Sequence, residues 1–123
     1  MIKSKQEIIN ETVGYYSEDP TRRAIYTDKH GFTDCRYLTD DGKMCAVGRC
    51  LSTPPKGDFG DVYELDTKID LEKSLKPEYR GHALEFWYTL QAIHDTAQSW
   101  DNTGLTNQGR ALVRSTEEKW IND

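Results

Sequence analysis

The sequence has little of what membrane, secreted and nucleic-acid-binding proteins need. No apolar run approaches the roughly 20 residues that cross a bilayer. The stretch Met1–Glu7 contains no hydrophobic core of a signal peptide and no small-residue cleavage site, so we expect no signal peptide. Lys and Arg total 16 against 21 Asp and Glu, and the net charge of −5 argues against general nucleic-acid binding. These absences predict a soluble protein of the cytoplasm.

Hydrophobic residues are also few, at 36%, whereas charged residues reach 30%. Three Trp, seven Tyr and three Phe compensate with large apolar surfaces. A chain of 123 residues fits one domain, 1–123, and no internal repeat suggests more than one. We therefore expect a folded single domain with a thin, aromatic-rich core.

The N-terminal segment predicts a helix. Ser4 and Glu7 have the spacing of a capping box, and Asp19-Pro20 is typical of a helix end, so the helix should fade near Ser17. Apolar and small residues recur behind the cap at helical spacing. They are Ile8, Ile9, Thr12, Val13 and Tyr16.

The C-terminal third predicts two antiparallel helices. The first runs from near His82 to Trp100, the turn Asp101–Gly104 follows, and Thr106 caps the second. Both have apolar stripes at steps of three and four residues. The stripes are Leu84, Phe86, Trp87, Leu90, Ile93, Ala97 and Trp100, and then Leu112, Val113, Thr116 and Trp120.

A β-hairpin is predicted between these helical regions, with arms 35–39 and 43–47. A type I turn with Gly42 in the left-handed region pairs Tyr37 with Cys45 and places Cys35 on the same face. The second arm has an alternative, a short helix over 46–51. A weaker signal suggests a strand at 24–26, followed by a turn at 28–31.

Together these elements predict an α+β fold with three main helices, including a C-terminal helical hairpin, and one β-hairpin. A short helix is also expected between Val62 and Leu75. The expected core residues are apolar members of the stripes and of the hairpin. They are Ile9, Val13, Leu38, Val47, Leu84, Trp87, Leu90, Ile93, Leu112, Val113 and Trp120.

Two segments carry a resemblance to known sequences. The first contains Cys35-Arg36-Tyr37, Asp41-Gly42 and the run 45–51, and the second is Leu90-Gln-Ala-Ile-His-Asp95. In this order they resemble a family of small uncharacterised phage and prophage proteins. The resemblance implies a phage setting, and hence the cytoplasm of a host cell, but no biochemical activity.

The three cysteines suggest one form of metal chemistry. Cys35, Cys45 and Cys50 with one histidine have the donor atoms of a Cys₃His zinc site. However, nine and then four residues separate them, whereas structural zinc ligands usually come in pairs two to four residues apart. The preferred interpretation is that they pack as small apolar side chains and that no cofactor is needed, with zinc as the alternative.

A catalytic interpretation is weaker. Cys45 with His94 and Asp95 has the residue types of a cysteine hydrolase. Neighbouring helical residues point about 100° apart, which predicts that Asp95 is poorly placed to orient His94. The chain also has no glycine-rich phosphate loop, so an enzyme is not expected and a small hydrolase is the least favoured alternative.

Binding is the favoured interpretation. Arg36, Tyr37, Arg49 and His94 are candidate ligand-binding residues, because arginines beside an aromatic ring recognise phosphates and carboxylates. Trp87 or Tyr88 is a candidate contact for a partner protein, since both cannot face one core. We expect a phage accessory protein that binds a host protein or a small nucleotide signal without catalysis, inhibits host defence, and in the nucleotide case acts as a homo-oligomer.

Overall fold

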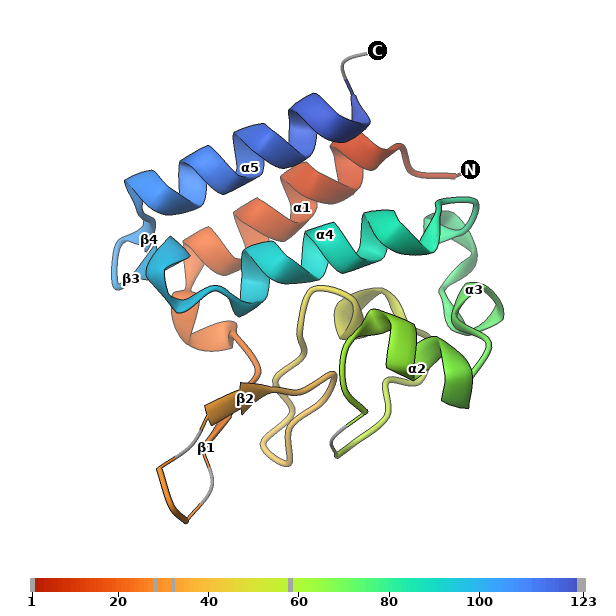
Figure 1. Ribbon diagram of the computed structural model, residues 1–123, viewed down its shortest axis with the longest axis horizontal. Helices are drawn as coiled ribbons and strands as arrows, with labels where there is room; N and C mark the ends of the chain where they lie inside the picture. The colour runs from red at the N-terminus through yellow and green to blue at the C-terminus, as the bar shows by residue number, and fades with distance from the viewer. Residues whose placement is uncertain (1, 28, 32, 58, 122–123) are drawn as a thin grey trace.

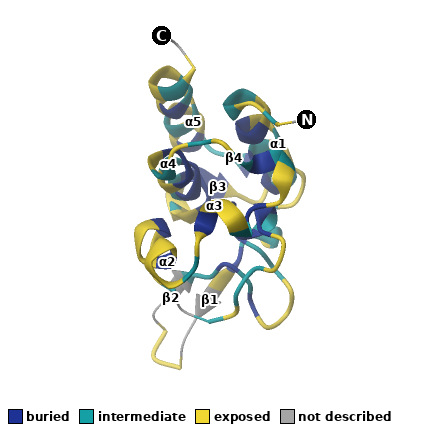
Figure 2. Cartoon of the chain, turned by 90° about the vertical axis from the view of Figure 1, so that its right-hand side faces the viewer, coloured by how far each residue is buried: buried dark blue, intermediate teal, exposed yellow. Residues whose placement is uncertain are grey.

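Three long helices form a bundle that supports the rest of the chain. The computed structural model describes residues 2–121 except 28, 32 and 58. Helices α1 (Lys5–Glu18), α4 (Leu84–Asp95) and α5 (Asn107–Trp120) run alongside one another in the upper half of Figure 1. Figure 2 shows them from their ends, with the buried residues turned toward the space that the three helices share. The bundle is thus the main structural layer.

The predicted caps of α1 and α5 are confirmed. Ser4 Oγ accepts from the Glu7 amide at 3.1 Å, and the Glu7 carboxylate accepts from the Ser4 amide at 2.9 Å. At the start of α5, Thr106 Oγ1 accepts from the Gly109 amide at 3.1 Å. Each bond satisfies an amide that has no partner within its helix.

Helix α4 is shorter than the sequence predicts. It ends at Asp95, and the chain continues through the 3₁₀ turn η4 (Ala97–Ser99) into β3 (Trp100–Asp101), which pairs with β4 (Gly104–Leu105). The buried indole of Trp100 donates to the Ile93 carbonyl at 2.8 Å. Trp100 therefore satisfies one of the open carbonyls at the end of α4 instead of extending its apolar stripe.

The predicted β-hairpin is confirmed in register but not in length. The Thr39 amide donates to the Lys43 carbonyl at 2.8 Å, Leu38 and Met44 form a single antiparallel bridge, and Gly42 has φ +87°. The longer ribbon joins β1 (Ile25–Thr27) to β2 (Thr33–Cys35) and projects from the bundle in Figure 1. The predicted turn at 28–31 begins at residue 28, which lies outside the described residues.

The α+β class is confirmed, but its details need correction. In the described part of the chain, two shorter helices, α2 (Val62–Lys68) and α3 (Leu71–Ser74), accompany the three long ones, and there are two β-ribbons instead of one. Short 3₁₀ turns also occur in the connecting segments. They are η1 (Pro20–Arg22), η2 (Gly48–Cys50) and η3 (Pro77–Tyr79). Helix α2 packs below α4 in Figure 1.

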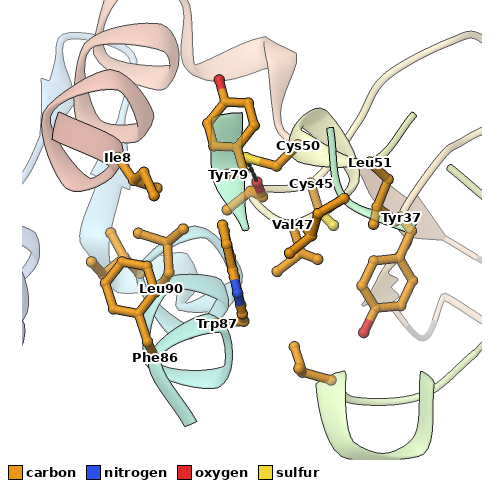
Figure 3. Packing of buried hydrophobic residues seen from close by; sticks show 14 of the residues in the cluster. Ile8, Tyr37, Cys45, Val47, Cys50, Leu51, Tyr79, Phe86, Trp87 and Leu90 are labelled. Carbon is orange, nitrogen blue, oxygen red and sulfur yellow. Dashed lines mark hydrogen bonds between the residues drawn. The ribbon is translucent and has the colours of Figure 1, made fainter. Parts of the chain in front are cut away.

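The core lies between the bundle and the segment around η2. Trp87, on α4, is only 1% exposed and packs edge-on against Phe86, with ring centroids 5.3 Å apart. Figure 3 shows its ring between Phe86 and Val47. Of the predicted core, Ile9, Val47, Trp87, Leu90 and Ile93 are buried, and Val13, Leu38, Leu84, Leu112, Val113 and Trp120 are half-buried.

Among the described residues, none of the helices combines the length and the apolar character that a bilayer crossing requires.

Candidate functional site

A pocket of about 280 Å³ opens where three segments meet. Cys35 at the end of β2 and Tyr37 just after it form one wall. Asp61, which precedes α2, forms a second, and the last two turns of α4 form the third. Segments that are far apart in the sequence therefore build one concavity, which is typical of ligand sites.

Two close contacts fix the Tyr37 wall. The Tyr37 hydroxyl donates to the Gly60 carbonyl at 3.1 Å, which links this wall to the residues before α2. A Cβ added at Gly48 would lie 2.1 Å from the Tyr37 carbonyl oxygen. Only glycine allows this approach, so η2 packs directly against the backbone of Tyr37.

Behind the pocket, His94 holds Asp95. The His94 ring is 0% exposed, and its Nδ1 lies 2.8 Å from Asp95 Oδ1. The Ala24 amide donates to His94 Nε2 at 3.1 Å. Because Nε2 accepts, the proton of the neutral ring is on Nδ1, which donates to the carboxylate. Burial lowers the pKa of His94, which favours this neutral form.

The prediction that Asp95 is poorly placed to orient His94 is therefore wrong in its geometry. The angle of about 100° separates the Cα–Cβ directions of neighbouring helical residues. Asp95 is the last residue of α4, and its side chain meets the imidazole at the helix end. The bond couples the two side chains, and His94, which the Ala24 amide holds from its other side, fixes the position of the carboxylate.

Gln91 is a second support of Asp95. Its Nε2 donates to Asp95 Oδ1 at 2.7 Å, and its Oε1 accepts from the Val47 amide at 3.0 Å. The Asp95 side chain is 40% exposed and lines the pocket. Sequence reasoning did not single out Gln91 as a site residue. The signal was present, because residues 91, 94 and 95 lie three and four positions apart on one helix face.

The thiols are not activated. Burial and then the charge of Asp95 raise the pKa of Cys35, and burial raises the pKa values of Cys45 and Cys50 to about 12. All three are therefore protonated near neutral pH. Since the thiolate is the nucleophilic form, the structure does not supply the nucleophile of a cysteine hydrolase.

The predicted Cys₃His ligand set is not brought together. Among the described residues, which include every cysteine and histidine, the group of three close enough for a metal is Cys35, His94 and Asp95, with ligand atoms within 4.8 Å. Cys45 Sγ instead accepts from the Gly48 amide, and the Cys50 thiol donates to the Ala46 carbonyl.

The Cys35–His94–Asp95 group does not fit a metal ion as it is arranged. A ligating histidine offers a bare ring nitrogen to the metal and donates its other N–H to an acceptor. In His94, Nδ1 carries the proton, and Nε2 faces the donating Ala24 amide. Metal binding at either nitrogen would break a buried hydrogen bond.

The two predicted binding arginines separate in the structure. Arg36 lines the pocket beside Tyr37. Arg49 lies elsewhere, where its guanidinium pairs with Glu11 at 3.2 Å and lies over the ring of Tyr79, 6.0 Å from its centroid. Its assignment as a ligand-binding residue is corrected: Arg49 joins η2 to α1, and its half-buried position explains this role.

The aromatic pair of α4 also separates. Trp87 is 1% exposed and belongs to the core, so its assignment as a partner contact is wrong. Tyr88 is 43% exposed and lines the pocket. Its ring centroid is 5.2 Å from that of Tyr63, an exposed residue of α2. We call Tyr63 and Tyr88 the tyrosine pair.

Comparisons of the chain with protein-family models, curated proteins and solved structures find no match.

Proposed function

We propose that this protein is a small, non-catalytic accessory protein of the phage type, and that its pocket binds a component of the host cell. One observation carries the proposal. The Asp95 carboxylate is held by two buried donors, His94 and Gln91, and yet remains 40% exposed in the pocket wall. Such support fixes a charged group before a ligand arrives, which reduces the entropy lost on binding.

The chemistry of the surrounding groups supports binding over catalysis. A general base must reach its substrate, whereas His94 is fully buried and both its ring nitrogens are engaged. A nucleophile must be deprotonated, whereas the pKa of Cys35 is raised. The site thus has fixed polar groups for recognition.

The charge of the lining favours a protein partner over a nucleotide signal. Of the described residues that line the pocket, Asp61 and Asp95 are acidic and Arg36 is basic. A phosphate in the pocket would face two carboxylates, and contact between like charges is unfavourable. The tyrosine pair at the rim adds exposed aromatic surface, which is enriched in protein interfaces. Inhibition of a host defence protein is the role that this proposal favours.

A pocket-filling variant tests the proposal. Ala92 lines the pocket, so Ala92→Phe should occupy it, and Ala111→Phe makes the same change on the exposed side of α5. A thermal-shift screen would use amino-acid derivatives, amines, nucleotides and carboxylates. We expect compounds that raise the melting temperature of the wild type and of Ala111→Phe but not of Ala92→Phe. If every stabilising compound acts equally on Ala92→Phe, the pocket is not the binding site.

A further inference from the structure

Asp95 offers the pocket a negative charge. Both His94 and Gln91 bond to the same oxygen, Oδ1, and both donors are neutral. Arg23 acts on this charge only from a distance, because its Nε donates to the His94 carbonyl at 2.8 Å and not to the carboxylate. The carboxylate is therefore oriented by neutral donors and retains its charge toward the pocket.

Arg36 is the one basic side chain among the described lining residues, whereas Asp61, Tyr37 and Asp95 offer acceptors to the pocket. Asp61, which lines the pocket, caps α2 by accepting from the Glu64 amide at 2.9 Å through Oδ1, and its second oxygen remains an acceptor. The Tyr37 hydroxyl uses its proton on the Gly60 carbonyl, so its oxygen can only accept from a ligand. The Gln91 amide uses its oxygen on Val47 and one N–H on Asp95. With two carboxylates and the Tyr37 oxygen against one guanidinium, this lining favours a ligand that is rich in donors.

Shape and size narrow the ligand further. At about 280 Å³ the pocket lies just below the roughly 300–1,000 Å³ of sites for drug-sized molecules, so it fits one side chain better than a whole nucleotide. Tyr88 presents a half-exposed ring in the wall. A flat cation stacks on such a ring and donates in its own plane to carboxylates, and guanidinium does both.

From these observations we infer that the pocket binds a guanidinium group, that of an arginine side chain or of a free guanidinium compound, with Asp95 as its ion-pair partner and Tyr88 as its stacking surface. This inference rests on the proposed function and names its ligand class. It also assigns to Asp95, Asp61 and Tyr88 the recognition role that the sequence suggested for Arg49 and His94.

Blocked amino acids test the cation directly. Arginine and citrulline, each N-acetylated and C-methylamidated, differ in charge but hardly in shape. Amide shifts in ¹⁵N–¹H spectra of the labelled protein would be followed during titration. We expect the arginine derivative to shift the amides of 88–96 with a dissociation constant near the millimolar range, and citrulline to bind at least tenfold more weakly. Equal binding of citrulline would overturn the inference.

Two variants that each remove one negative charge test whether Asp95 recognises the cation. Asp95→Asn can still accept from His94 and Gln91 while removing the charge, whereas Glu118→Gln removes a charge from the exposed side of α5. Asp95→Asn should weaken arginine binding about tenfold, and Glu118→Gln should not change it. If Asp95→Asn does not fold, Asp61→Asn and a rise from 50 to 500 mM NaCl replace it, and both must weaken binding. Binding unaffected by these changes would contradict an ion pair.

A variant of the tyrosine pair distinguishes an arginine side chain from a free guanidinium compound as the ligand. Tyr63 is close to Tyr88, but the described pocket lining includes only Tyr88 of the two. A ten-residue peptide with one central arginine should bind more tightly than methylguanidinium and should lose that advantage in Tyr63→Ala. If instead methylguanidinium binds as tightly as the peptide and Tyr63→Ala affects neither, the ligand is a free guanidinium compound.

The inference and the proposed function can fail separately. If an anion such as adenosine monophosphate binds and Ala92→Phe abolishes that binding, the guanidinium inference is wrong, but the proposal that the pocket binds a ligand is supported. If none of the screened compounds and peptides shows binding that is sensitive to Ala92→Phe, both are wrong.

Discussion

His94 donates its Nδ1 proton to Asp95 Oδ1 across 2.8 Å, although the two residues are neighbours in sequence and the ring is fully buried. The Ala24 amide closes the other side of the ring at 3.1 Å and fixes which nitrogen carries the proton. A buried neutral imidazole thus joins the β1 side of the molecule to the exposed carboxylate at the end of α4.

The stability contributed by His94 should decline in mild acid. Burial lowers its folded-state pKa below the ordinary 6.5, while hydrogen bonding to Asp95 and the Asp95 charge oppose this shift and the charge of Arg23 adds to it. The unfolded state therefore takes up the proton first. The contribution is complete above pH 6.5 and is lost as the pH falls from there toward the folded-state pKa. The ring of Tyr16, 5.0 Å away, adds no charge that would reverse the sign.

A comparison with His94→Gln isolates this effect from other acid-sensitive groups. Urea unfolding at pH 7.5 and at pH 5.5 gives the free-energy difference between the wild type and the variant at each pH. The difference should be smaller at pH 5.5. A difference that grows at pH 5.5 would contradict the prediction, because it would mean that His94 binds its proton more tightly in the folded state than in the unfolded state.

Gln91→Ala should destabilise the fold by about 1–3 kcal/mol, because it leaves the buried Val47 amide without its 3.0 Å acceptor. Gln98→Ala is the matched control, since Gln98 lies exposed in η4 and should change stability by less than about 0.5 kcal/mol. Urea unfolding measures both. Equal effects of the two substitutions would show that the Val47 bond contributes nothing specific.

Gly48→Ala and Gly14→Ala should change stability in opposite directions. A Cβ at Gly48 would lie 2.1 Å from a backbone oxygen, and the forced shift should cost about 1–3 kcal/mol. Gly14 lies exposed within α1 with nothing within 4 Å of the added carbon, so alanine there should stabilise by about 0.5–1 kcal/mol. Thermal unfolding of the two variants checks both signs. A neutral Gly48→Ala would mean that η2 can move away from Tyr37 freely.

Metal chelation should not change the melting temperature. His94 faces the Ala24 amide through Nε2 and carries its proton on Nδ1, so zinc binding would sacrifice a buried hydrogen bond. Melting curves with and without EDTA should coincide, and native mass spectrometry should give the mass of the chain without zinc. A mass increase of one zinc that is lost on denaturation would contradict this prediction and make Cys35 and Asp95 ligands.

Local signals in the sequence predicted those parts of the fold that local bonds determine. Ser4 and Thr106 cap their helices, and Gly42 adopts the positive φ of its turn, because each bond or conformation involves residues within four positions. The end of α4 was not predictable in this way. Trp100 has the right spacing to continue the helix, but its indole bonds to the Ile93 carbonyl from outside it.

In the candidate site, too, the features set by neighbouring residues were predictable and those set by distant contacts were not. The predicted hairpin register is confirmed by the Leu38–Met44 bridge, and Cys35, Tyr37 and Cys45 all line the pocket. Arg36, which strand alternation would place on the opposite face, lines it as well. The third wall comes from α4, more than 40 residues later in the sequence, and no local pattern shows that Gln91 reaches the Val47 amide. Nor does an arginine in the sequence reveal its partner, and Arg49 turned out to pair with Glu11.

Helix α4 presents Trp87 and Leu90 to the core and, within the next two turns, Gln91 and Asp95 to the pocket. Mutations that alter recognition will therefore often alter stability as well, and few substitutions can tune one property alone. An evolving lineage would change its specificity more easily at Tyr63, Tyr88 and Asp61, whose side chains lie at the surface. We expect natural variation to concentrate at this rim, while the His94–Gln91 support behind Asp95 changes little.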